Sequence, residues 1–351
     1  MKIVLAHNLY GSESPSGENA VFEVEAELLR QRGHTIIELV RSSDEIRRQG
    51  TWGSIKGALS TPWNPFSKLK AERLTRRECP DIFHVHNSFP LLSPSVFYAA
   101  GKFGTATVLT LHNFRTFCAA GIPMRDGKPC TECLDRRSVW PALRYRCYRG
   151  SFAATVPMAA MIWLHRRLKT WERQVDAFVA LTEFQKDLLC EAGLPRDRVF
   201  VKPHFYPNPP EPLPWAEREG KVLFVGRLGA EKGCHILLEA WQRWGAEAPH
   251  LEVIGDGPER LKLEATVANT SLGGKVSFRG QLAFKDVQIS LRRARLLVLP
   301  SLCFEGFPMV IREAYALGVP VAASRLGSMP CLIEEGVTGT LFETGNPDDL
   351  L

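Results

Sequence analysis

Short apolar runs alternate along the chain with stretches whose apolar residues recur at helical spacing. The first run, KIVLA at 2–6, is followed by a glycine-bearing loop over 11–17 and a helical pattern between 21 and 29. Such runs predict buried parallel strands, and the spacing predicts helices. We expect further strands over 34–40, 81–86, 107–112 and 177–181, with helices over 93–103 and 158–173.

A proline-rich segment divides this pattern in two. Six prolines fall between Pro203 and Pro214, where they remove backbone donors and stiffen the chain. Strand and helix patterns then resume over 221–225, 233–244, 250–254, 259–268, 275–279, 284–293, 295–299, 309–317 and 319–323. The sequence therefore predicts an α/β protein with a doubly wound domain over 1–204, a linker over 205–217 and a second doubly wound domain over 218–351.

Two stretches of the first half break the alternation. Residues 41–77 carry nine Lys or Arg against three acids, interspersed with Trp, Pro and Gly, and residues 113–150 are rich in Arg and Cys. We interpret both as irregular excursions from the domain.

The last residues resemble the start of a helix. Asn346 is suited to the N-cap, Pro347 to the first helical position, and Asp348 and Asp349 to the positive end of the helix dipole. We expect the natural product to continue beyond Leu351 and the second domain to be truncated here.

Composition narrows the class of protein. With 351 residues, 45% of them hydrophobic, the chain is neither disordered nor fibrous. Its longest nearly apolar run, 152–164, is too short to span a bilayer, and the apolar start is too short for a secretory signal, so we expect a cytoplasmic protein. Nine cysteines then indicate thiols or metal ligands rather than a disulfide framework.

Charge is distributed unevenly. Residues 1–205 hold 29 basic and 20 acidic side chains, whereas residues 206–351 hold 15 and 18. The basic half suits an anionic partner such as a phosphate or a lipid surface, and a solvated basic face remains an equal alternative.

Two carboxylates stand out in the stretch LLVLPSLCFEGFPMVIREAYALGVP at 296–320. Glu305 lies in the predicted loop and Glu313 in the helix that follows it. Both can reach one ligand over the helix N-terminus, where free amides suit a phosphate and carboxylates accept hydrogen bonds from sugar hydroxyls. On spacing alone, a solvated Glu313 is equally consistent with the sequence.

With these motifs the chain resembles family four of the retaining glycosyltransferases, which have the GT-B fold. The resemblance extends over 2–350 and includes FVGRLGAEKG, VIGDGPE, LVLPS, FEGFP with REA and GVPV, and EGVTG. It implies two Rossmann-like domains facing each other across a cleft, a nucleotide diphosphate-sugar donor and a glycan, lipid-linked or small-molecule acceptor.

The resemblance also implies roles for individual residues of the second half. Arg227 and Lys232 match the basic pair that holds the donor diphosphate, as the planar fork of Arg and the point charge of Lys would allow. Glu305 matches the carboxylate on the transferred sugar and Glu313 the one on the ribose. The matching donor-binding backbone positions are Gly306, Phe307 and, in the first domain, Gly17.

His112, at the end of the predicted strand TVLTLH, resembles the family histidine near the transferred sugar. A purely structural histidine remains the alternative. With His112 and Glu305 as catalytic residues, the resemblance implies transfer in which the donor phosphate accepts the acceptor's proton. It implies no cofactor and no catalytic metal, because cationic side chains and backbone amides bind the diphosphate and stabilise its charge.

A cysteine pattern, C-x11-C-x2-C-x13-C, lies in the second excursion. Its members, Cys118, Cys130, Cys133 and Cys147, are candidates for a structural zinc site. Reduced structural cysteines are the first alternative and a redox pair is the second.

Residues 152–171 combine Met, Ile, Leu and Trp with nearby Arg and Lys. Such a helix can lie in a membrane interface, which suits a peripheral protein with a lipid-linked acceptor at an anionic leaflet, and core packing remains the alternative.

Two residues depart from the pattern of the family, and functions other than sugar transfer remain as alternatives. Pro308 stands where many members have Gly, and Cys331 near a frequent Glu. A sugar-nucleotide epimerase of the same fold and an inactive nucleotide or carbohydrate binder are the alternatives to transfer. Dehydrogenase activity is disfavoured because the loop GSESPSG lacks the G-x-G-x-x-G fingerprint, and no motif supports nucleic-acid binding.

Overall fold

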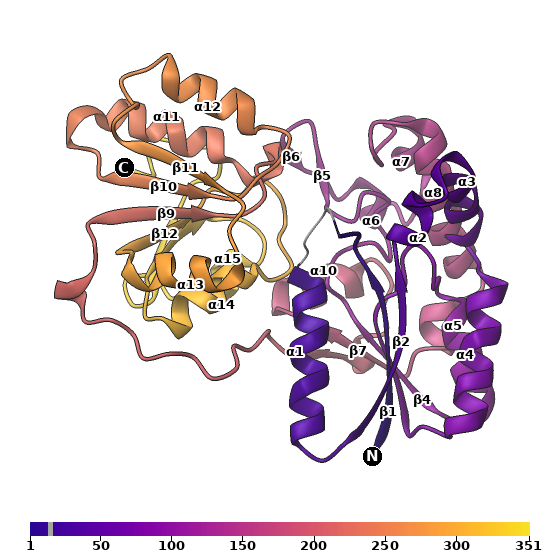
Figure 1. The fold of residues 1–351 in the computed structure, drawn as a ribbon. Coiled ribbons are helices and arrows are strands. Elements are labelled where there is room, and N and C mark those ends of the chain that lie inside the picture. The colour runs from indigo at the N-terminus through magenta and orange to yellow at the C-terminus, as the bar shows by residue number, and fades with distance from the viewer. Residues whose placement is uncertain (13–16) are drawn as a thin grey trace. The chain divides into compact units, whose positions relative to one another are not determined.

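The computed structural model describes residues 1–12 and 17–351, and the chain divides into two compact units. Unit 1 comprises Met1–Ile122 and Thr131–Pro203, and unit 2 comprises Pro123–Cys130 and His204–Leu351. In the described part of the chain each unit contains a six-stranded parallel sheet with helices around it (Figure 1). Two Rossmann-like units confirm the predicted fold class.

Unit 1 alternates strands and helices for most of its length. Its strands are β1 (Lys2–Leu9), β2 (Thr35–Ser42), β3 (Ile82–Asn87), β4 (Ala106–Thr110), β7 (Ala177–Ala180) and β8 (Val199–Val201). Its helices are α1 (Gly17–Gln31), α2 (Asp44–Arg47), α3 (Gly50–Ser60), α4 (Pro65–Glu78), α5 (Ser95–Ala100), α6 (Glu132–Asp135), α7 (Trp140–Arg144), α8 (Phe152–Arg167), α9 (Thr170–Arg173) and α10 (Glu183–Glu191).

Unit 2 follows the same alternation. Its strands are the hairpin β5 (Met124–Arg125) and β6 (Lys128–Pro129), then β9 (Lys221–Val225), β10 (His250–Ile254), β11 (Val276–Gly280), β12 (Leu296–Leu299), β13 (Val321–Ser324) and β14 (Gly339–Phe342). Its helices are α11 (Cys234–Trp244), α12 (Arg260–Ala268), α13 (Phe284–Arg293), α14 (Met309–Ala316) and α15 (Met329–Leu332). Short 3₁₀ helices occupy Gly101–Phe103, Arg196–Arg198, Trp215–Glu217, Ala230–Lys232 and Gly245–Glu247.

The strand order determines where each sheet can bind a ligand. In unit 1 the order is β2-β1-β3-β4-β7-β8, and in unit 2 it is β11-β10-β9-β12-β13-β14. The order therefore reverses direction between β1 and β3 in one sheet and between β9 and β12 in the other. Ligands of such sheets bind beyond the carboxyl ends of the strands at this switch point.

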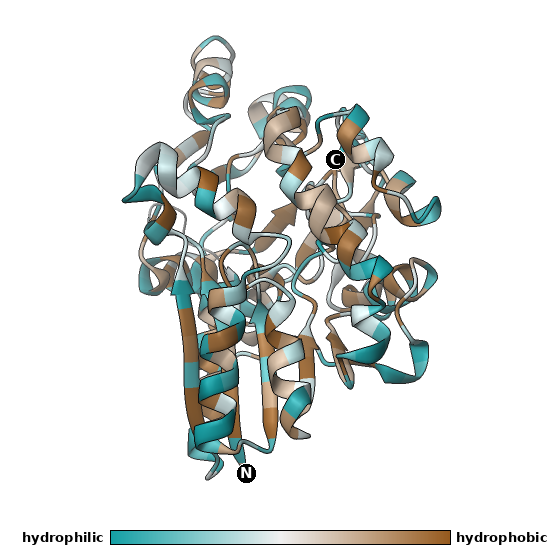
Figure 2. Ribbon diagram, turned by 90° about the vertical axis from the view of Figure 1, so that its right-hand side faces the viewer, coloured by the Kyte–Doolittle hydropathy of each residue, from teal (hydrophilic) through white to brown (hydrophobic). Residues whose placement is uncertain are grey.

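Alternating side chains of β9 show how the sheet of unit 2 is buried on both faces. Val222 and Phe224 pack into one core with Trp241 of α11, and Leu223 packs into another with Ile311 of α14. The period of two along a strand sends successive residues to opposite faces. Figure 2 shows the result for the molecule as a whole, with largely hydrophobic strands and helices that carry hydrophilic stretches.

The expectation of an irregular excursion over 41–77 is wrong, because α2, α3 and α4 occupy most of it. Gly53 does not break α3 but lets it approach α2: a Cβ at this position would lie 2.0 Å from the carbonyl oxygen of Ile46. Pro65 is the first residue of α4, where a missing N–H costs nothing, and the side chain of Asn64 caps the helix by accepting from the amide of Ser67. The apparent helix breakers are thus helix boundaries and packing positions.

Other boundaries differ in smaller ways. The helix expected over 158–173 is two helices, α8 and α9, separated by Lys169 with a φ of 53°. The edge strands β8 and β14 were not expected, because three or four residues give too little pattern. At the end of the chain Asn346 Oδ1 accepts from the amides of Asp348 and Asp349, as the predicted cap requires, but the residues that follow form turns.

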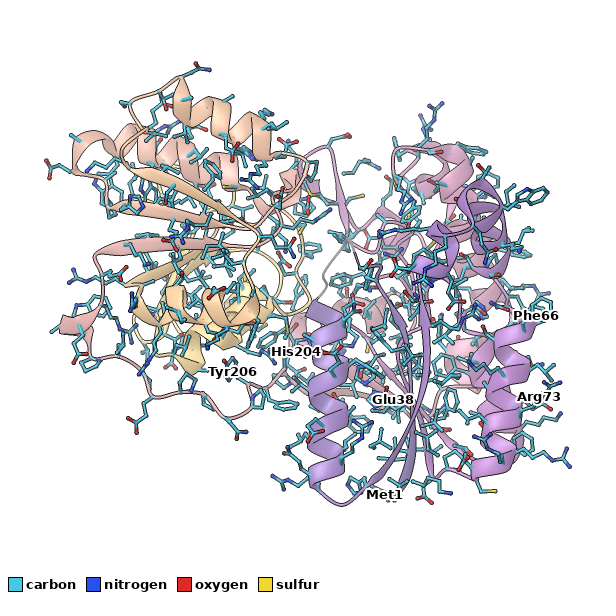
Figure 3. All side chains as sticks on the ribbon, in the orientation of Figure 1. Met1, Glu38, Phe66, Arg73, His204 and Tyr206 are labelled. Carbon is cyan, nitrogen blue, oxygen red and sulfur yellow. The ribbon has the colours of Figure 1, made fainter. Side chains whose placement is uncertain are left out.

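The proline-rich segment forms no regular element over 202–214. The two units divide within it, between Pro203 and His204. Figure 3 labels His204 and Tyr206, which lie on the part that belongs to unit 2.

Candidate functional site

The switch point of unit 2 brings two predicted site residues into contact. Lys232 follows β9, Glu305 follows β12, and the Lys232 Nζ lies 2.6 Å from Glu305 Oε1. The loop that carries Lys232 can approach the end of β12 because the next residue is Gly233. Gly233 has a φ of +68°, and a Cβ on it would lie 1.8 Å from the Pro300 carbonyl oxygen, so only glycine fits.

Serine hydroxyls hold Glu305 in place from two sides. Ser301 Oγ donates to Glu305 Oε1 at 2.8 Å, and Ser328 Oγ donates to the Glu305 carbonyl oxygen at 2.7 Å. Burial alone would lower the pKa of Lys232, but the surrounding groups, with Glu305 first among them and Glu231 contributing less, together raise it above its ordinary value. The site therefore presents an oriented cation and carboxylate before any ligand arrives.

Arg227, the other predicted basic residue, is placed differently. Its side chain is exposed and forms an ion pair with Glu231, one turn further along the chain. A diphosphate would have to compete with Glu231 for this guanidinium.

Gly306 and Phe307 connect Glu305 to helix α14. Both are half-buried, and the ring of Phe307 lies edge-on to His204 with centroids 5.5 Å apart. Since α14 begins at Met309, these residues precede its first turn, where backbone amides point away from the helix. Pro308 is its N-cap, so the departure from the family glycine leaves the helix start intact.

Glu313 is buried within α14 and belongs to a separate polar network. Gln288 Nε2 donates to Glu313 Oε2 at 3.1 Å, and the Arg312 guanidinium lies 3.8 Å from Oε1. Burial raises the pKa of Glu313, against the opposing effects of Arg312 and Gln288. The alternative of a solvated helix residue is therefore wrong, since Glu313 is only 8% exposed.

The proline-rich segment reaches this network through Tyr206. Its hydroxyl donates to Gln288 Oε1 at 2.9 Å, and its ring lies 5.6 Å from the Arg312 guanidinium. Arg312 in turn donates to the Phe205 carbonyl oxygen. Sequence reasoning missed Tyr206, Gln288 and Arg312, because neither spacing nor residue type distinguishes them from surface residues.

His112 lies at the corresponding edge of the sheet of unit 1, directly after β4. Its Nε2 is 3.1 Å from Nδ1 of His86 on β3, and the two rings stack with centroids 5.3 Å apart. Both histidines line a pocket together with Asn87, Thr110 and Arg115. His112 therefore opens onto a surface that can receive a ligand, whereas His86 orients it from behind.

Behind His86 lies a buried polar cluster that the sequence did not reveal. Glu25 Oε1 is 3.6 Å from His84 Nδ1 and 4.0 Å from His86 Nε2, and Glu25 Oε2 is 2.7 Å from Lys202 Nζ. Burial lowers the pKa of His84 to about 4, and burial with the neighbouring histidines lowers the pKa of His86 well below its ordinary value. Both imidazoles are therefore neutral at pH 7.

Glu25, His84 and His86 are also the group of metal-ligand side chains that the described residues bring within 4.8 Å of one another. Lys202 already neutralises Glu25, and His86 uses its other nitrogen toward His112. A divalent cation would add positive charge beside the Lys202 ammonium, which lies 2.7 Å from Glu25, so these residues do not fit a metal well.

Among the described residues, no three of the four predicted cysteine ligands have sulfurs within 4.8 Å of one another. Cys118 and Cys133 are buried, Cys130 and Cys147 half-buried, and burial raises the pKa of the Cys118 thiol to about 11. The geometry gives the zinc hypothesis no support.

Gly17 is the first residue of α1 and is exposed. The loop expected before it falls partly on residues 13–16, outside the described residues. Cys331 is exposed at α15. No helix in the described ranges combines the length and apolarity that crossing a bilayer requires.

Two family models together match most of the chain. The model described as Glycosyltransferase Family 4 matches residues 17–206, and the one described as Glycosyl transferases group 1 matches residues 207–351. The two matches meet within the proline-rich segment.

Curated relatives share parts of the sequence. An uncharacterized glycosyltransferase, MJ1178, of Methanocaldococcus jannaschii is 35% identical over 128 residues, which are 36% of this chain and 35% of that protein. The putative colanic acid biosynthesis glycosyltransferase WcaL of Escherichia coli is 26% identical over 182 residues, 48% of this chain and 44% of the relative. The chain spans between about a fifth and a half of the length of the curated relatives it matches.

Solved structures share the fold over the whole chain. Anabaena Alr3699/HepE in complex with UDP has a TM-score of 0.63 at 18% identity, covering 100% of this chain and 88% of the other. Sucrose-phosphate synthase of Thermosynechococcus elongatus has a TM-score of 0.65 at 16% identity, covering 99% and 87%. At these identities the likeness shows the fold, which is that of GT-B proteins.

Proposed function

Because this chain belongs to glycosyltransferase family 4, we propose that it transfers a sugar from a nucleoside diphosphate-sugar donor to a hydroxyl of an acceptor, with retention of configuration. Family membership rests on a match to more than half of the chain. The donor, the stereochemistry and the acceptor are the proposed parts.

One observation carries the proposal: the Lys232–Glu305 pair at the switch point of unit 2. A nucleoside diphosphate sugar joins an anionic diphosphate to a hydroxyl-rich ring. The ammonium of Lys232 suits the first part and the carboxylate of Glu305 the second, and their 2.6 Å contact places both at one point.

The remaining donor contacts are assigned from unit 2. Arg227 and the amides of Gly306 and Phe307 would bind diphosphate oxygens, as planar guanidinium groups and helix-start amides do. Glu313 would accept hydrogen bonds from ribose hydroxyls through the carboxylate that Gln288 holds. HepE, with UDP bound, supports a nucleotide donor of this kind.

In the proposed reaction the bond from the anomeric carbon to the diphosphate oxygen breaks, and a bond to the acceptor oxygen forms on the same face. The acceptor's proton passes to the departing nucleoside diphosphate, so no protein base is needed. Lys232 and Arg227 stabilise the negative charge that develops on the leaving group. His112, held by His86, would orient a hydroxyl of the transferred sugar.

The test is to incubate the protein with UDP-, GDP- and ADP-linked sugars and a panel of glycan and lipid-linked acceptors, with and without EDTA. We expect release of one nucleoside diphosphate, NMR spectra of a product with the donor's anomeric configuration, and no effect of EDTA. Isomerisation of the donor sugar without release would favour an epimerase, and no change in any donor would contradict catalysis.

A further inference from the structure

Three neighbouring helices of unit 1 expose large apolar side chains. Helix α8 contacts both α3 and α7 (Figure 1). The exposed fractions are 71% for Trp52 on α3, 74% for Trp140 on α7 and 59% for Trp163 on α8. We call this set of outward-facing residues on α3, α7 and α8 the tryptophan surface.

These side chains do not belong to the core, because the same helices bury a different face. On α8, Met158 and Ile162 are buried, whereas Phe152, Val156 and Trp163 are exposed at helical spacing. On α3 the glycines Gly53 and Gly57 face inward, while Trp52, Ile55 and Leu59 face outward. Each helix therefore has a second apolar face that the fold of unit 1 does not use. Clusters of this kind mark interaction sites.

The three helices themselves carry basic side chains and no acidic ones. The sequences of α3, α7 and α8 contain no Asp or Glu, but they contain Lys56, Arg144, Arg166 and Arg167. Glu132 lines a hollow next to Trp140, but it forms an ion pair with Arg136, so the basic residues remain in excess. Tryptophans with a basic excess match the interface of an anionic bilayer, where indole rings lie at headgroup depth and cations meet lipid phosphates.

A groove between the tryptophans provides a site for a phosphate. It is lined by Trp140 and Trp163 together with the three arginines Arg137, Arg166 and Arg167. The two terminal nitrogens of Arg166 are buried and have no hydrogen-bond partner among the described residues, and its guanidinium lies 4.8 Å over the ring of Phe117. These buried nitrogens are not open to the groove, so the exposed guanidinium groups of Arg137 and Arg167 are the donors that a phosphate in it can meet.

We propose that the tryptophan surface docks unit 1 onto anionic phospholipid membranes, with lipid phosphate in the groove of Arg137, Arg166 and Arg167. The protein would bind peripherally, with Trp52, Trp140 and Trp163 inserted among the headgroups. Donor binding in unit 2 does not require this surface. The inference therefore goes beyond the proposed function and can be tested independently of it.

The experiment is co-sedimentation of the full chain with vesicles of phosphatidylcholine alone and with about 30% phosphatidylglycerol, at about 50 mM and 300 mM salt. Trp140→Ala/Trp163→Ala tests insertion, and Arg137→Gln/Arg167→Gln tests the charges. Trp215→Ala removes a tryptophan of unit 2 that is 56% exposed and serves as the matched control. Circular dichroism of every variant verifies folding.

We expect binding to the anionic vesicles that weakens with salt, since exposed charges are screened. Each removed arginine should reduce the partition coefficient about fivefold, and the tryptophan pair should reduce it at least tenfold, whereas Trp215→Ala should change nothing. Nucleoside diphosphate binding should be the same in all variants, which separates this test from that of the transferase.

Equal binding to neutral vesicles, no binding at low salt, or binding that the variants leave unchanged would overturn the proposal. Thermal stabilisation by inorganic phosphate without vesicle binding would assign the groove to a free phosphate. Binding of a second protein copy to the same face in sedimentation velocity, in place of vesicles, would assign the surface to self-association.

Discussion

The two units place different chemistry on the same architectural feature. Both have a parallel sheet with one switch point, but at that edge unit 1 presents His112, backed by the buried His84, His86 and Glu25, whereas unit 2 presents the charged pair Lys232 and Glu305. Burial keeps His84 and His86 neutral, whereas Lys232 stays charged despite its burial because Glu305 lies 2.6 Å from its ammonium. The fold thus determines where on each unit a ligand can bind, and a few side chains determine which chemical group of the ligand binds there.

Glu305→Gln should reduce the transfer rate more than the other substitutions, and it tests the role of the Lys232–Glu305 pair most directly. The amide keeps the size of the side chain but removes the charge that faces Lys232 and the transferred sugar. We expect the transfer rate to fall by about 10²–10³, the usual loss when one preorganised electrostatic group is removed.

Steady-state rates with saturating donor measure this loss. Glu335→Gln is the matched control, since Glu335 makes an exposed ion pair with Arg325 in the same unit. An equal loss in both variants, or none in Glu305→Gln, would remove Glu305 from the site.

Acid should destabilise unit 1 more than unit 2. The folded-state pKa of His84, about 4, lies below the ordinary 6.5, so its contribution to stability is complete above pH 6.5 and is lost as the pH falls toward 4. The loss approaches about 3 kcal/mol at pH 4.

Amide hydrogen exchange at pH 7 and pH 5 resolves the two units. The amides of β3 should lose protection relative to those of β9 after correction for intrinsic rates. The same change in both strands would mean that His84 does not determine the acid response.

Lys232→Met should weaken nucleoside diphosphate binding by about 10- to 100-fold, because a charge-assisted hydrogen bond to phosphate is lost. Calorimetry with the diphosphate and with inorganic pyrophosphate should give the same ratio, since Lys232 acts on the phosphates alone. A loss confined to the nucleoside diphosphate would place Lys232 elsewhere on the ligand.

Glu313→Gln should give the smallest effect, about tenfold, because a neutral acceptor remains for the ribose hydroxyls. Pyrophosphate binding should not change. If pyrophosphate binding fell equally, Glu313 would act on the structure of α14 rather than on the ribose.

Sequence predicted unit 2 better than unit 1, for physical reasons. The strands β9 and β10 and helix α13 match their predicted ranges, because each is a short periodic segment between clear turn signals. In unit 1, the glycines and prolines of 41–77 suggested loops where the structure has helices. The close packing of Gly53 against Ile46, which makes a glycine useful within α3, depends on tertiary structure that local propensity does not record.

The candidate site shows the same limit. Lys232, Glu305, Glu313 and His112 were identified from motifs, but their partners were not. Glu25 and Lys202, 177 residues apart, meet only because α1 and the end of β8 come together in the folded unit. Tyr206 and Gln288 likewise meet through tertiary contacts alone.

The most direct measurement of the central claim is a calorimetric titration of UDP, GDP and ADP, free and sugar-linked, into the wild-type protein and Glu313→Gln. The account predicts that one nucleoside diphosphate binds with a stoichiometry of about one, more tightly than the other two, and that the substitution weakens it. Absence of binding to all three by the folded protein would contradict a nucleotide-sugar site in unit 2.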